Sequence, residues 1–127
     1  MSNDVAVELI RAVVDHQRGL HDAWESFAVV VELSGGRVRG TSGFGYGPGE
    51  VVSAIAARPS GVQPAVQDYL ASYFGDGDEP PVKLLVQFDR TQGAYEVTFE
   101  DTDTERWKVT PANLDATREE LRPRFEA

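Results

Sequence analysis

The residues that could do chemistry are few in this sequence, and none stands in a recognisable catalytic arrangement. Glycines alternate over Gly43–Gly49, but a phosphate-binding loop joins a strand to a helix and usually carries a lysine, which is missing here. His16 and His21 are five residues apart and do not share one face of a helix. Ser42 falls in an expected strand, whereas a nucleophilic serine of the elbow type stands at a strand-to-helix turn. We therefore predict a protein that is not an enzyme, without catalytic residues, cofactor or metal site.

Acidic side chains are the stronger signal. Residues 74–105 hold nine acidic residues against two basic ones, a net charge of −7, while the other 95 residues hold twelve acidic and ten basic ones. The spacing Asp101-x-Asp103-x-Glu105 resembles the start of a calcium-binding loop, but the central glycine and the closing glutamate are missing. The cluster is either a solvated face that aids solubility or a surface for a basic partner. The residues that we expect to contact a partner are Asp76, Asp78, Glu79, Asp101, Asp103, Glu105 and Trp107.

The composition fits one acidic domain over residues 1–127. The chain has a net charge of −9 and 41% hydrophobic residues, and its length is sufficient for a single core. The lack of cysteine excludes disulfides and Cys-based metal sites. Apolar runs are too short to span a membrane and the first residues do not resemble a secretion signal, so we expect a cytoplasmic protein without a membrane partner. The negative charge argues against direct binding of nucleic acid.

Alternating apolar residues predict a first antiparallel hairpin. Residues 24–33 alternate with period two, and the Gly35-Gly36 dipeptide suits a tight turn into a second strand over 37–46. If these glycines form the loop, apolar residues face each other and opposite charges meet. The expected pairs are Leu33 with Val38, Phe27 with Phe44 and Glu32 with Arg39.

A second hairpin is the clearest feature of the chain. Two alternating runs, over residues 82–88 and 95–99, flank the turn Arg90–Gly93, in which the glycine can take a left-handed conformation. The expected pairs on one face are Phe88 with Tyr95, Val86 with Val97 and Leu84 with Phe99. This register also places residue 82 opposite residue 101, which brings the two acidic segments together.

Three helices are expected around these hairpins. Helical spacing predicts one before Gly19 and a second over 62–74, after a break at Arg58–Gly61. Thr110-Pro111 is typical of a helix start, and residues 50–57 fit either a short helix or a strand. The helices must cover the apolar faces of the hairpins. The prediction is an α+β fold of order α-β-β-α-β-β-α, with a sheet of about four strands and about three helices.

Several motifs run through this order of elements. An N-terminal helix leads into the tryptophan-started strand Trp24–Glu32, and the next strand ends in Phe44-Gly45-Tyr46. The runs Leu84–Asp89 and Gly93–Asp101 follow the middle helix. With these motifs, most of the chain resembles the YezG-like family of immunity proteins, the antitoxins of bacterial polymorphic toxin systems. The resemblance implies a cytoplasmic protein that binds and blocks the catalytic domain of a toxin made alongside it, often a nuclease.

The acidic cluster and the resemblance together predict a non-enzymatic immunity protein that occludes the active site of a secreted toxin, one to one. Carboxylates can occupy sites meant for phosphates, so the expected partner is a basic C-terminal toxin domain that acts on nucleic acid, NAD or another phosphate-bearing substrate. Trp107 fits either an interface anchor or a core residue. Two alternatives stay open: a regulatory subunit with an unrelated basic partner, and a small-molecule-binding or enzymatic domain. The pocket of the latter would lie between sheet and middle helix and be lined by Tyr46, Tyr69 and Tyr73.

Overall fold

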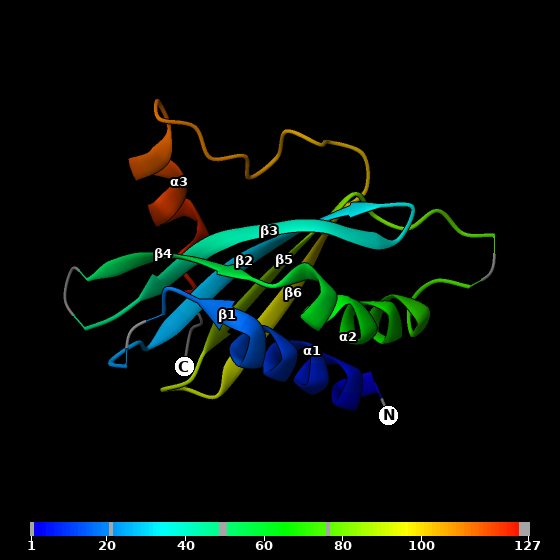
Figure 1. The fold of residues 1–127 in the computed structure, drawn as a ribbon, viewed down its shortest axis with the longest axis horizontal. Helices are drawn as coiled ribbons and strands as arrows, with labels where there is room; N and C mark the ends of the chain where they lie inside the picture. The colour runs from blue at the N-terminus through cyan, green and yellow to red at the C-terminus, as the bar shows by residue number, and fades with distance from the viewer. Residues whose placement is uncertain (1, 21, 49–50, 76, 125–127) are drawn as a thin grey trace.

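One antiparallel sheet organises the chain (Figure 1). The computed structural model describes residues 2–20, 22–48, 51–75 and 77–124. The elements are α1 (Ser2–His16), β1 (Gln17–Arg18), β2 (Ser26–Ser34), β3 (Arg37–Tyr46), β4 (Val52–Ala57), α2 (Pro59–Ala71), β5 (Lys83–Asp89), β6 (Ala94–Glu100) and α3 (Leu114–Leu121). The strands lie in the order β1-β4-β3-β2-β5-β6. None of the helices in the described ranges is long and apolar enough to cross a membrane.

The predicted α+β class is confirmed, but over the described ranges the sheet has six strands instead of about four. The two additional strands, β4 and β1, lie together at one edge. β4 forms from the ambiguous segment, and it does alternate: Ile55 and Ala57 are buried while Ala54 and Ala56 are exposed. Alanine on both faces hides this period-two pattern in the sequence. The hydroxyl of Thr41 fixes the end of the strand, since it donates to the carbonyl oxygen of Ala57 (2.7 Å) and accepts from its N–H (2.8 Å).

Both predicted hairpins form, and all three predicted pairs of the β5–β6 hairpin are confirmed. In the β2–β3 hairpin Leu33 lies opposite Val38 as predicted, but the register shifts between Glu32 and Leu33. The predicted pairing of Phe27 with Phe44 is therefore wrong, as is that of Glu32 with Arg39. The partners are Phe27 with Gly45, Ala28 with Phe44 and Glu32 with Gly40. The reason is an extra residue in β3, a bulge that side-chain alternation beside the turn does not reveal.

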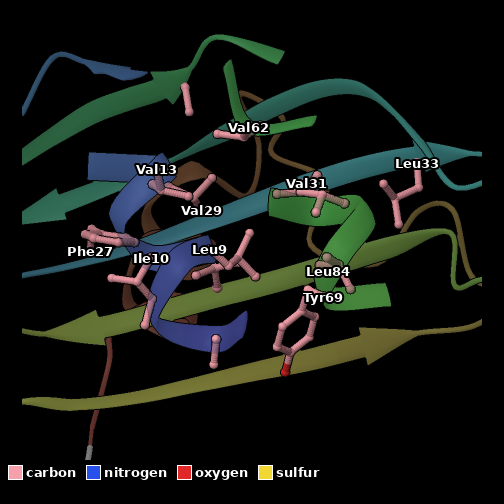
Figure 2. Packing of buried hydrophobic residues seen from close by; sticks show 14 of the residues in the cluster. Leu9, Ile10, Val13, Phe27, Val29, Val31, Leu33, Val62, Tyr69 and Leu84 are labelled. Atoms are coloured by element: carbon pink, nitrogen blue, oxygen red, sulfur yellow. The ribbon is translucent and has the colours of Figure 1, made fainter. Parts of the chain in front are cut away.

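Helices α1 and α2 cover one face of the sheet and form the larger core with it (Figure 2). In that view Val13 of α1 lies beside Val29 of β2, and Tyr69 of α2 lies beside Leu84 of β5. The first turn of α2 includes the segment that the sequence predicted as a break, because Pro59 is tolerated at the start of a helix. These two helices leave the other face of the sheet for the C-terminal part of the chain.

The segment over residues 101–124 covers that second face (Figure 1). Trp107 and Leu121 pack in a second core cluster that includes Ala28 and Val30 of β2. Because Phe27, Val29 and Val31 belong to the larger core, β2 is buried on both faces. The residues of the second cluster are Ala28, Val30, Phe44, Tyr46, Leu85, Trp107 and Leu121.

The third helix begins at Leu114, four residues after the predicted start at Thr110. Thr110 and Asn113 instead bond to each other in a turn: the Thr110 N–H donates to Asn113 Oδ1 at 2.7 Å, and the Asn113 N–H donates to Thr110 Oγ1 at 3.3 Å. The hydroxyl of Tyr46 donates to the carbonyl oxygen of Arg118 at 2.7 Å and so ties the helix to the sheet. Burial raises the pKa of this hydroxyl well above its usual range.

Candidate protein-binding surface

The two acidic segments leave the same end of the β5–β6 ladder. Lys83 at the start of β5 lies opposite Glu100 at the end of β6. One residue earlier, the N–H of Val82 donates to the carbonyl oxygen of Glu100 at 2.8 Å. The loop before β5 and the segment after β6 therefore begin side by side, as the predicted register required. From this end the segment after β6 crosses the face opposite α1 and α2 (Figure 1).

Glu100 shapes the acidic segment after β6. Its Oε1 accepts a hydrogen bond from Arg106 Nη1 at 2.8 Å, and its Oε2 accepts from the N–H groups of Thr102 (3.2 Å) and Asp103 (3.1 Å). The Arg106 bond and the two backbone bonds lower the pKa of Glu100 to about 2. Sequence reasoning counted this carboxylate among the charges of the cluster. Its position as the last residue of a strand before a tight loop is the signal for a local capping role instead.

The expected contact residues divide into constrained and free carboxylates. Asp103 Oδ1 accepts from the Glu105 N–H at 2.9 Å, and Asp78 Oδ2 accepts from the Gly75 N–H at 2.7 Å, so both stabilise their own loops. Glu105 forms an exposed ion pair with Lys108 at 3.4 Å. Glu79 and Asp101 are exposed and make no hydrogen bond or ion pair with other residues in the described ranges. These two carboxylates are the ones best able to meet a partner.

Two other expected contact residues have different outcomes. Asp76 lies outside the described residues. Trp107 is only 8% exposed and belongs to the second core cluster, which favours the core alternative for this residue. Its backbone has a φ of 65°, and the guanidinium of Arg106 lies 4.4 Å from the centre of its ring. The tryptophan therefore anchors the acidic segment to the sheet.

A buried lysine lies beneath this segment and was missed by sequence reasoning. Lys83 is 3% exposed; its Nζ donates to the carbonyl oxygen of Arg106 at 2.9 Å and lies 3.8 Å from Glu32 Oε1. It lines a hollow of about 300 Å³ whose other charged residues are Glu32, Arg39, Glu105 and Lys108. The signal was its place in β5, where it alternates with Leu84 and shares a face with the buried Leu85. The hollow holds charges of both signs.

The pocket expected between sheet and middle helix does not bring the three tyrosines together. Tyr69 of α2 and Tyr73 just after it pack against each other with ring centres 5.0 Å apart and ring planes tilted by 45°, and both contact Phe99. Tyr46 belongs instead to the cluster on the opposite face of the sheet. Its hydroxyl is occupied by the bond to Arg118.

Three comparisons, with models of protein families, with curated protein sequences and with solved structures, find no match to this chain. Among the described residues no group of three or more His, Asp or Glu side chains is arranged to hold a metal ion. The surface presents exposed carboxylates on two adjoining loops, and Glu100, Trp107 and Lys83 hold the loop after β6.

Proposed function

We propose that this chain is an immunity protein that binds a basic toxin domain and occludes its active site without any reaction of its own. The observation that carries the proposal is the exposure of Glu79 and Asp101 on two loops that leave one end of the sheet. The resemblance to YezG-like immunity proteins supports the same function. In this proposal the protein acts in the cytoplasm of the cell that makes the toxin.

The charge of the surface favours a partner that binds phosphate. A groove that receives nucleic acid or NAD needs cations, and carboxylates held on a rigid loop can pair with those cations. Opposed charges mainly speed association and select the partner, while a few central contacts supply most of the affinity. An inhibitor of this kind buries roughly 1,600 Å² in total.

Charge reversal at the two free carboxylates tests the proposal. The partner is the toxin domain expected from the adjacent reading frame, and association is followed by stopped flow at several salt concentrations. Glu79→Lys and Asp101→Lys together should slow association about tenfold at low salt and flatten its salt dependence. Glu120→Lys changes the charge of an exposed glutamate on α3 and serves as the control. Unchanged association and unchanged protection by the double variant would mean that the acidic loops serve solubility only.

A further inference from the structure

We propose that the outer edge of β6 receives an extended segment of the partner, with alternating apolar and basic residues, as a seventh strand of the sheet. The inference deepens the proposed function and rests on it only for the identity of the protein that supplies the strand. Three independent features of the described residues carry it: an uncovered strand edge, an apolar groove beside that edge, and an exposed acidic side chain on the opposite face.

The outer edge of β6 is uncovered by other strands of the described ranges. β6 is the last strand on its side, and no other strand in the described ranges pairs with its outer edge. At the opposite edge of the sheet, the short strand β1 (Gln17 and Arg18) pairs with β4. Gly19 then passes so close to Ala54 that a Cβ would collide with the alanine's carbonyl oxygen. β6 thus presents a seven-residue edge whose outward N–H and C=O groups are available to a further strand.

An apolar groove adjoins this edge on the side of α1. It has a volume of about 350 Å³ and is lined mainly by apolar side chains. Val7 is 42% exposed and Tyr95 is 36% exposed, which is high for apolar side chains this large. The apolar lining of the groove comes from Val7, Ile10 and Val14 of α1 and from Phe88 and Tyr95 of the β5–β6 hairpin. In an added strand every second side chain would point toward this groove.

The charges next to the groove determine which side chains of the added strand fit on each face. Arg11, which pairs with Glu8 at 3.3 Å, also lines the groove, so a basic side chain is disfavoured there and an apolar one fits. On the other face of β6, Glu96 is exposed and lies opposite the uncharged Gln87 of β5. A lysine or arginine of the added strand would therefore be the first cation to face this carboxylate across the ladder.

The same charge argues against a second copy of this chain as the occupant. Two β6 edges paired with each other would place the Glu96 carboxylates of both copies on one face of a continuous sheet, where like charges repel. An acidic residue on an edge strand is a common protection against such self-pairing. Pairing of this edge with a second copy is thus unfavourable, whereas pairing with a basic strand is favourable.

A short peptide tests this without knowledge of the toxin. The probe is an acetylated and amidated heptapeptide in which lysine and valine alternate, and its binding is followed by NMR and by amide hydrogen exchange of the full chain. We expect shifts in β6 and around the groove, and slower exchange of β6 amides. The same peptide methylated on every backbone nitrogen has no N–H to donate to β6, so it cannot form the ladder and should not bind. Equal binding of the methylated peptide, or shifts confined to the acidic loops, would overturn the inference.

Two pairs of variants locate the contact. Val7→Lys, in the groove, and Glu96→Lys, on the opposite face, should each weaken peptide binding roughly tenfold. Val109→Lys and Glu120→Lys make the same changes at exposed positions outside this surface and should leave it unchanged. Because both tested side chains are exposed, the variants retain the packing of the core. If neither variant weakens binding, the β6 edge is not the site.

Neutralisation assays with the toxin distinguish a failure of the β6 site from a failure of the proposed function. If the wild-type chain neutralises the toxin and the Val7→Lys and Glu96→Lys variants still do so, the immunity function is supported and the β6 site is overturned. Binding of the peptide at β6 by a chain that protects against no toxin would support the site and overturn the immunity function. Loss of neutralisation in the two variants, but not in their controls, would support both.

Discussion

Replacing Trp107 with alanine should lower the free energy of unfolding by about 3–5 kcal/mol. The indole is 8% exposed, and an aromatic side chain of this size buries about 200 Å². At about 25 cal/mol per Å² this area corresponds to about 5 kcal/mol. The contact with the Arg106 guanidinium, 4.4 Å from the ring centre, is lost as well. Because the ring holds residues 101–124 on the sheet, the loss should be felt first in that segment.

The assay combines denaturant unfolding with amide hydrogen exchange. Trp107→Ala should speed exchange in α3, whose Leu121 shares the same cluster, more than in β5. Trp107→Gly provides an internal comparison: a φ of 65° is strained for alanine but not for glycine, so the glycine variant should be the more stable by about 1 kcal/mol. Val109→Ala, at an exposed position in the same segment, should change stability by less than about 0.5 kcal/mol.

A loss below about 1 kcal/mol for Trp107→Ala, with unchanged exchange in α3, would refute this reasoning. It would mean that the ring fills space without fastening the segment to the sheet. A glycine variant less stable than the alanine variant would refute the assignment of backbone strain at this residue.

Three further predictions concern single contacts. Glu100→Gln removes a carboxylate whose pKa is lowered from 4.5 to about 2, so its stabilising effect is full above pH 4.5 and is lost as the pH falls toward 2; unfolding curves of variant and wild type should converge over that range. Gly43→Ala would force a Cβ against the carbonyl oxygen of Ala28 and should cost about 1–3 kcal/mol or more in denaturant unfolding, whereas Gly40→Ala, where the nearest atom to a Cβ is Glu32 Oε2 at 3.8 Å, should cost less. Tyr46→Phe leaves the carbonyl of Arg118 without its partner and should cost about 1 kcal/mol; an unchanged midpoint of denaturation would contradict the bond.

The predictable parts of the fold were those in which several signals agree. In the β5–β6 hairpin, alternation, the turn glycine and three apolar pairs all required one register, and that register is correct. In the β2–β3 hairpin the register next to Gly35-Gly36 is correct, but the bulge beyond Leu33 shifts it. The inserted residue shifts the alternation of β3 by one, but it falls beside the small residues Gly40, Thr41, Ser42 and Gly43, which carry no apolar pattern in which the shift could be seen.

The less predictable parts depended on distant contacts. β4 is rich in alanine and becomes a strand because Thr41 and β3 supply its hydrogen-bond partners. Trp107 was counted with the acidic surface, yet it packs in a core cluster with residues of β2, and the buried Lys83 bonds to the carbonyl oxygen of Arg106, which is distant in the sequence. For the candidate site, the sequence predicted which loops adjoin, whereas only the structure distinguished the free carboxylates of Glu79 and Asp101 from those used locally.

The double burial of β2 also has a consequence during synthesis. Val30 is translated well before Trp107 and Leu121, the residues that shield it. The nascent sheet therefore exposes one apolar face until Trp107 and Leu121 have been translated, and a message truncated before Trp107 should yield an aggregation-prone product even though both hairpins are present.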